Sequence, residues 1–329
     1  MKIAAALLLC LASTAAAAPL RAVKLAALSG TCAIQHDGTL VCEKATDLPA
    51  VEMRMRDLVH AYTPLVVRED GSLVRVDRSY SVVDKPRIET LAVPFKVKTA
   101  GLVGSSKNDQ LCVHGEKGEL ACRPFQHTGD DPKAAFTTLP GRFVDVTFAH
   151  DIVWALDDKG ALWCAGAFDC ARLHVAAKKA PKKTLLELDA TYPTAFDEPK
   201  DAPFWRIADG VKRVYAAGAP CIERTSDAKT LVCWGWTDGP KAYPRPQAQE
   251  LASVGSMMCA RTGDAITCTM FGNKSHEPFT VRVKDAAKMH YGNSRFCVET
   301  KTGELRCAKL GNPLPPFEKV TWAVRTPKE

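Results

Sequence analysis

The thirteen cysteines are the residues of this 329-residue sequence whose type and spacing suggest defined chemistry. Cys10 lies in an apolar N-terminal stretch, and twelve cysteines follow it. An even number suits a disulfide framework in an oxidising compartment, whereas metal sites favour spacings such as Cys-x2-Cys with nearby histidine, which this sequence lacks. We therefore expect disulfides rather than metal ligands, free buried thiols or a nucleophilic cysteine, and no cofactor.

The spacing of the cysteines pairs them locally. Residues that are symmetric about a hairpin turn face each other at a distance that a disulfide can span, as Cys112 and Cys122 do about Lys117. Cys164 has Trp154 opposite it and is free to pair with Cys170. The predicted bridges are Cys32–Cys42, Cys112–Cys122, Cys164–Cys170, Cys221–Cys233, Cys259–Cys268 and Cys297–Cys307.

Two pairs of positions vary this pattern. Leu65 and Arg75 occupy the two cysteine positions of one hairpin, so that hairpin has neither a disulfide nor an unpaired cysteine. Cys259 and Cys268 are one residue closer than usual, which predicts a two-residue type II′ turn beginning at Gly263.

The elements that position these cysteines form an internal repeat. A strand, a short hairpin turn and a second strand recur seven times, with about 45 residues per unit, the size of a four-stranded propeller blade. The turn glycines suit three-residue loops that end at φ > 0, and they are Gly38, Gly71, Gly118, Gly160 and Gly303. One weak helix is expected at 182–189. The approximate repeats are 20–50, 51–95, 96–141, 142–209, 210–249, 250–285 and 286–329.

We therefore predict an all-β, seven-bladed β-propeller over residues 18–329, with four-stranded antiparallel blades and disulfides inside its hairpins. The repeat ends in Cys-Trp-Gly most clearly at Cys233, Trp234 and Gly235. With its Cys-Ala strand and Asp-Gly turn, this motif resembles the repeat of the regulator of chromosome condensation (RCC1) family, in particular its secreted bacterial members. The resemblance covers nearly all of 18–329, apart from the second repeat and the long inserts.

The resemblance implies blades that radiate from a central channel and a role in binding proteins. The nuclear member of the family acts on a small GTPase and chromatin, and secreted bacterial relatives include an inhibitor of β-lactamases. Neither activity transfers residue by residue, because this sequence does not visibly share the interaction loops.

The N-terminal segment 1–17 has the layout of a cleaved signal peptide: Lys2, an apolar run and small residues up to Ala17. The run is too short to span a bilayer as an anchor, and Leu9 before Cys10 does not fit a lipid-attachment signal. We expect a secreted or periplasmic protein with no transmembrane segment.

The remaining composition favours a binding module. A net charge of +7 is modest for a nucleic-acid binder, and a secreted protein would not meet chromatin. A sialidase-like enzyme would need a different turn spacing. The histidines show no metal-ligand or triad spacing; seven of the eight are His60, His114, His127, His150, His174, His276 and His290. We expect a monomeric, non-catalytic protein-binding propeller; the alternatives are a glycan-binding or sialidase-like enzyme and a structural envelope protein.

The expected binding face carries the long inserts. Segments 78–88, 123–139, 171–204, 237–248 and 272–278 all follow the second hairpin strand, which places them on the face opposite the glycine turns. The largest insert and its end offer cations and aromatics for an acidic or mixed protein partner or a cell-envelope ligand, namely Lys178, Lys179, Lys182, Lys183, Tyr192, Phe196, Phe204 and Trp205. The alternative is that the lysines are solvated and the aromatics pack the insert onto its blade.

Overall fold

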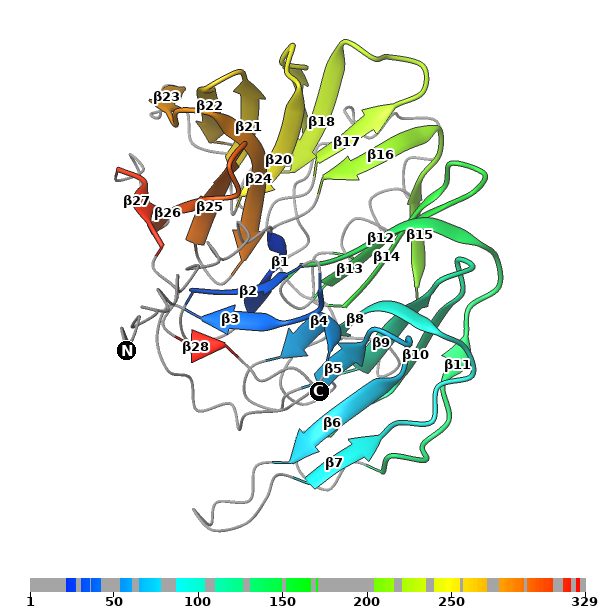
Figure 1. The fold of residues 1–329 in the computed structure, drawn as a ribbon. Helices are drawn as coiled ribbons and strands as arrows, with labels where there is room; N and C mark the ends of the chain where they lie inside the picture. The colour runs from blue at the N-terminus through cyan, green and yellow to red at the C-terminus, as the bar shows by residue number, and fades with distance from the viewer. Residues whose placement is uncertain are drawn as a thin grey trace, which may run out of the picture.

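The structure, a computed structural model, is an all-β propeller (Figure 1). Its strands form seven antiparallel four-stranded sheets, which confirms the predicted fold class. Among the described residues, no helix is long and apolar enough to cross a membrane. The structure describes residues 22–27, 31–35, 37–42, 54–60, 65–77, 87–103, 110–126, 131–149, 152–166, 170, 204–215, 221–234, 240–254, 257–270, 278–292, 295–309, 316–320 and 324–325. The predicted signal peptide and the predicted helix at 182–189 lie outside these residues.

Each sheet is one blade. In blades 2 to 7 the strands follow one another along the chain from the innermost to the outermost, whereas the outermost strand of blade 1 is the last described strand of the chain. Blade 1 consists of β1 (Ala22–Ala27), β2 (Thr31–Gln35), β3 (Leu40–Cys42) and β28 (Val324–Arg325). Blade 2 consists of β4 (Met55–His60), β5 (Leu65–Arg68), β6 (Leu73–Asp77) and β7 (Arg87–Thr90). Blade 3 consists of β8 (Val97–Val103), β9 (Gln110–Gly115), β10 (Leu120–Pro124) and β11 (Thr137–Thr138). Blade 4 consists of β12 (Phe143–Ala149), β13 (Ile152–Asp157), β14 (Leu162–Gly166) and β15 (Trp205–Ala208).

The remaining blades repeat the same order. Blade 5 consists of β16 (Val211–Tyr215), β17 (Cys221–Arg224), β18 (Thr230–Trp234) and β19 (Pro240–Pro244). Blade 6 consists of β20 (Glu250–Val254), β21 (Met257–Thr262), β22 (Ala265–Met270) and β23 (Phe279–Arg282). Blade 7 consists of β24 (Ala286–Gly292), β25 (Arg295–Thr300), β26 (Leu305–Lys309) and β27 (Glu318–Lys319).

The ring is closed by strands from both ends of the chain. In blade 1 the outermost strand β28 pairs with β3, with Val324 opposite Cys42 and Arg325 opposite Val41. Figure 1 shows this as a red strand beside a blue one. The inner strands also meet in cyclic order, and β24 of the last blade lies against β1 of the first. A C-terminal strand therefore completes the N-terminal blade.

The hydrophobic core lies between the blades. One cluster joins Trp154 and Leu162 of blade 4 to Val211 and Ile222 of blade 5. Another joins Leu65 of blade 2 to residues of blade 3. The middle strands are the most buried, because sheets cover both of their faces, so each blade depends on its neighbours for its stability.

The outermost strands correct part of the sequence interpretation. Segments 123–139 and 237–248, predicted to be inserts, contain β11 and β19. Both residues of β11 are exposed, and β19 begins and ends with proline. Short edge strands with exposed faces lack the apolar alternation that reveals a strand in the sequence, and proline is tolerated at an edge.

The hairpin turns have the predicted backbone. All five turn glycines have positive φ, from 76° at Gly38 to 92° at Gly118. In blade 2 the Arg68 amide donates to the Ser72 carbonyl at 2.8 Å, which closes a three-residue loop that ends at Gly71. Thr262 pairs with Ala265 around a two-residue turn in which Gly263 has φ of 59°. Asp285 is the sole described non-glycine residue with positive φ, so the second turn residue has negative φ, as a type II′ turn requires.

Candidate functional site

Five of the predicted disulfides are present. Cys112–Cys122, Cys221–Cys233, Cys259–Cys268 and Cys297–Cys307 each join the second and third strands of one blade, with Cα atoms 4.0–4.1 Å apart. Cys164–Cys170 has Cα atoms 5.7 Å apart, and Trp154 lies opposite Cys164 as expected. The backbones of Cys32 and Cys42 are also in register, but their bridge lies outside the described part of the chain.

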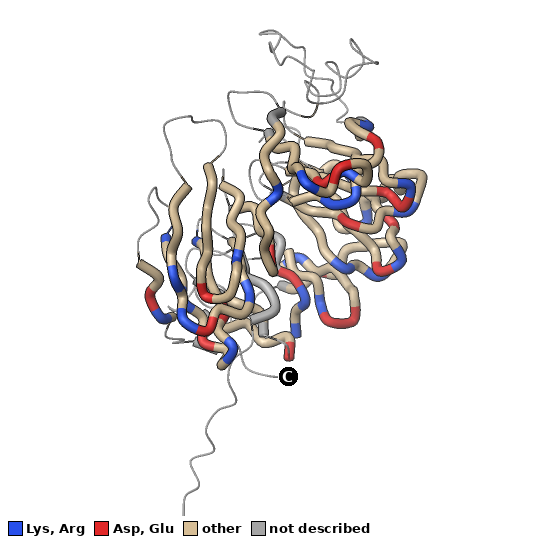
Figure 2. The backbone as a smooth tube through the Cα atoms, turned by 90° about the horizontal axis from the view of Figure 1, so that it is seen from above, with Lys and Arg blue, Asp and Glu red and all other residues tan. Residues whose placement is uncertain are grey.

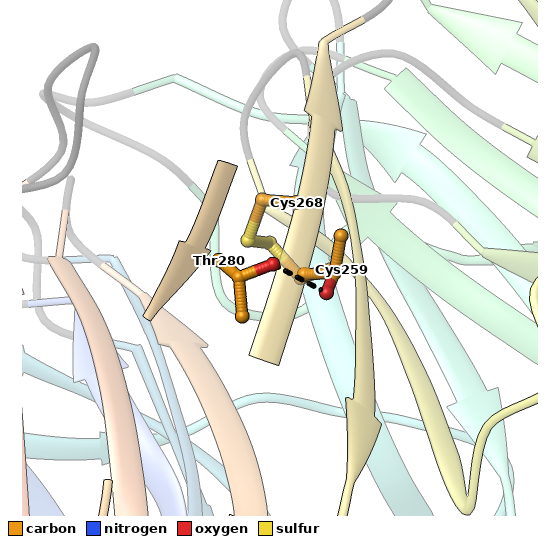
Figure 3. Close-up of a disulfide and its surroundings, with 4 residues drawn as sticks. Cys259, Cys268 and Thr280 are labelled. Carbon is orange, nitrogen blue, oxygen red and sulfur yellow. Dashed lines mark hydrogen bonds between the residues drawn. A yellow bond between two sulfur atoms is a disulfide. The ribbon is translucent and has the colours of Figure 1, made fainter. Parts of the chain in front are cut away.

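Blade 6 shows how a bridge fits into its sheet (Figure 3). The disulfide joins β21 to β22, and Thr280 of the outermost strand β23 lies beside it. The hydroxyls of Thr280 and Thr267 are 2.8 Å apart and opposite each other in the ladder. Disulfides in five blades indicate an oxidising environment, and each of them lies within one blade rather than joining two.

The predicted binding insert is almost entirely outside the described residues. This applies to Lys178, Lys179, Lys182, Lys183, Tyr192 and Phe196. Trp205 begins β15 with its backbone opposite Cys164, and its side chain is not described. Phe204 packs against the clusters between blades 3 and 4, so for this residue the structural alternative holds.

Two of the histidines are packed inside the propeller. His114 is buried, and its Nε2 donates to the Phe143 carbonyl of the next blade at 3.0 Å. Burial lowers the pKa of this imidazole, so it stays neutral at physiological pH. His290 lies 3.1 Å from Glu299 within its own blade. Both positions are structural, and the described part of the chain contains no group of three or more metal-ligating side chains.

A feature that the sequence interpretation missed is a ring of polar residues on the inner strands. In every blade one inner-strand residue pairs with the residue two positions beyond the first cysteine position of the second strand. Because the register is the same, these seven positions are equivalent around the propeller axis. We call them the axial polar ring: Lys24, Asp57, Thr99, Asp145, Arg213, Glu250 and Lys288.

The axial polar ring lies near the face that carries the glycine turns. The inner strands begin beside those turns, since the Phe143 amide donates to the Gly118 carbonyl. In six of the seven inner strands a β-bulge directly precedes the ring residue. Bulges re-aim side chains and are common at rims and near active sites. Figure 2 shows charged residues gathered at the tight bends along the lower side of that view; exposed charges in the turns are Glu69, Asp70, Glu116, Lys117, Asp158, Lys159 and Lys301.

The carboxylates of the ring are largely engaged between blades. Asp57 is 2% exposed and accepts a hydrogen bond of 2.7 Å from the Thr99 hydroxyl of the next blade. Glu250 accepts from the Met289 amide of the next blade at 3.0 Å and from Arg261 at 3.0 Å. Burial raises the pKa of Asp145, against the opposing effect of Lys98 and other cations. These acids therefore serve contacts within the propeller.

The cations at the same level are exposed. Arg213 of the ring and the bulge residues Lys98 and Lys212 all face solvent, as does Lys288. Lys212 has a carboxylate partner, Glu223, at 2.9 Å. Burial opposes ionisation of Glu223, but Lys212 and Arg245 together hold its pKa below the usual value. Among the described inner-strand residues at this level, these cations are thus exposed and the carboxylates are at least half-buried, while exposed acids lie in the adjacent turns.

A sequence signal for the ring exists in hindsight. Lys24 lies eight residues before Cys32, and Lys288 lies nine before Cys297. The spacing is longer in blade 3, from Thr99 to Cys112, because the connection between the first two strands is longer there. A search at fixed spacing therefore loses the pattern, and the register of the sheets restores it.

Comparison with known proteins gives the fold. No family model matches the chain, and no curated protein matches it. Yeast Prp20p from Saccharomyces cerevisiae, in a structure published with its binding properties to Gsp1p and histones, aligns at a TM-score of 0.53 and 12% identity, covering 87% of this chain and 80% of that one. Human WBSCR16 aligns at 0.52 and 11% identity, covering 83% and 85%. Both of these neighbours are RCC1-like propellers, and at these identities the likeness shows the fold alone.

Proposed function

We propose that the protein is a secreted or periplasmic, monomeric propeller that binds another protein and has no catalytic activity. The observation that carries this proposal is the scaffold itself: seven blades, five of them described with a disulfide, close into one ring of rigid hairpins. Rigid scaffolds that display variable loops are typical of binding proteins. The neighbour Prp20p is described with two protein ligands, which supports the same class of function.

The docking surface in this proposal is the face with the long inserts. Strand β14 ends at Gly166, at the end of the blade opposite the Gly160 turn, and the chain next re-enters the sheet at β15. The intervening segment carries lysines and aromatics, which can attract and anchor an acidic or mixed partner.

The experiment compares the full chain with a variant lacking 177–184 as baits in the envelope and medium of the producing organism. A saturable protein complex that weakens with salt and with the deletion would support the proposal. Equal capture by both baits would exclude this insert as the docking surface. Turnover of reporter glycosides would favour the enzyme, and the absence of both complex and turnover would favour a structural envelope protein.

A further inference from the structure

On the face opposite the long inserts, the rim formed by blades 3 to 5 carries the exposed residues Lys98, Val144 and Arg213. We propose that this rim docks an acidic segment of a protein, with an apolar side chain next to its carboxylates. The site consists of Lys98 on β8, Val144 and Asp145 on β12, and Lys212 and Arg213 on β16. It goes beyond the proposed function, because it is separate from the long inserts.

The residues of this rim are neighbours in space. The three strands are successive inner strands, and β12 lies between β8 and β16. Lys98 and Arg213 both act electrostatically on Asp145, so the two cations flank that carboxylate from either side. Each strand has a β-bulge here, at Lys98, Val144 and Lys212. Three successive bulges re-aim three side chains at one rim.

The charge of the rim favours an anionic partner. Asp145 is half-buried and its pKa is raised by burial, so its negative charge is poorly exposed. Lys98 and Arg213 are exposed. Arginine can bind a carboxylate through two parallel hydrogen bonds, whereas lysine acts as a point charge.

The apolar residue distinguishes a protein segment from a polyanion. Val144 is 51% exposed and is one of two large hydrophobic side chains exposed in the described part of the chain. The other is Ile88, 43% exposed, on the outermost strand β7. An exposed valine between two cations suits a partner that combines carboxylates with an apolar side chain. A nucleic acid or sulfated glycan would gain nothing from Val144, because neither presents an apolar side chain to it.

The test uses a fluorescein-labelled peptide of alternating glutamate and leucine, measured by fluorescence anisotropy against the full, disulfide-bonded chain at low and high salt. The double variant Lys98→Gln/Arg213→Gln should weaken binding about tenfold at low salt, and less at high salt. Val144→Ser should weaken it about threefold. Matched controls are Arg282→Gln/Lys309→Gln, which remove two exposed cations elsewhere, and Ile88→Ser. Each control should bind within about twofold of the unmodified chain.

Failure of this proposal is distinct from failure of the proposed function. Absence of peptide binding, or an equal loss in the control variants, would overturn the rim site. The alternative outcome is that a labelled heparin oligosaccharide binds more tightly than the peptide, with binding weakened by the double variant and unchanged by Val144→Ser. That result would show that the rim binds a polyanion and not a protein segment. The variant lacking 177–184 should bind the peptide normally, so loss of partner capture with retained peptide binding would support both surfaces.

Discussion

The carbonyl oxygen of Gly118 accepts a hydrogen bond of 2.8 Å from the amide of Phe143, so the hairpin turn of blade 3 holds the start of the inner strand of blade 4. The same bond recurs between three other pairs of neighbouring blades, at 2.8–2.9 Å: Gly38 with Met55, Gly71 with Val97 and Gly160 with Val211. The turns therefore define both the hairpin and the join to the next blade.

We predict that Gly118→Ala lowers the free energy of unfolding by more than the strain of placing alanine at positive φ, because the added methyl group would also collide with blade 4. Gly118 has φ of 92°, and an added Cβ would lie 2.7 Å from the Arg142 side chain and 2.9 Å from the Phe143 carbonyl. We expect a loss of about 3 kcal/mol in the free energy of unfolding, against about 1 kcal/mol for Gly210→Ala. Gly210 has φ of 66°, but a Cβ added there would contact just the Thr225 hydroxyl, at 3.3 Å. Equal losses in denaturant titrations would show that the close approach to blade 4 does not matter.

The disulfides should stabilise individual hairpins. Replacing Cys112 and Cys122 by valine should cost about 2–3 kcal/mol, because the bridge closes a short loop in the unfolded chain. Hydrogen exchange after reduction should rise in β9 and β10, while β5 and β6, where Leu65 faces Arg75, should change least. Uniform exchange in all blades would contradict local stabilisation.

Non-reducing peptide mapping should find a sixth bridge, Cys32–Cys42. The two residues are opposite each other in the β2–β3 ladder, as are the bridged cysteines of blades 3, 5, 6 and 7. Facing positions in such a pair are close enough for a disulfide. A bridge from either cysteine to another blade would overturn the prediction.

The closure of the ring depends on β28. A chain truncated after Val320 loses the outermost strand of blade 1, because Val324 and Arg325 pair with β3. We expect a lower melting temperature and faster hydrogen exchange in β3, while truncation after residue 326 should leave both unchanged. An unchanged melting temperature in the shorter chain would mean that β28 adds little to ring stability.

Asp145→Asn should raise the melting temperature at pH 7 but not at pH 3. Burial raises the pKa of Asp145, so the folded state disfavours its ionised form. The resulting loss of folding free energy is complete at pH values above the raised pKa and disappears below the pKa of the unfolded chain, about 3.9. Asp70→Asn is the matched control, for which we expect the opposite effect. Hydrogen bonds from the Ser72 hydroxyl and amide lower the pKa of Asp70, so loss of this carboxylate should reduce the stability of the fold at pH 7. Destabilisation by Asp145→Asn at pH 7 would show that Lys98 and Arg213 outweigh burial.

The sequence alone determined the blade and its bridges. Alternation, turn glycines and symmetric cysteine pairs are local signals, because a hairpin brings together residues that are few positions apart. Cys112 with Cys122, and Trp154 opposite Cys164, follow from counting about a turn. The sequence did not predict the outer strands β11 and β19, since exposed edge strands need no apolar alternation.

The tertiary structure alone decided what happens between blades and around the axis. Pairing of β28 with β3 joins residues about as far apart as the chain allows, and no local pattern specifies it. The axial polar ring and its bulges bring Lys98, Asp145 and Arg213 from three repeats to one rim, through a shared sheet register that loops of different length hide in the sequence. Side chains that meet across blades are set by the packing of whole sheets, whereas a sequence repeat describes one sheet at a time.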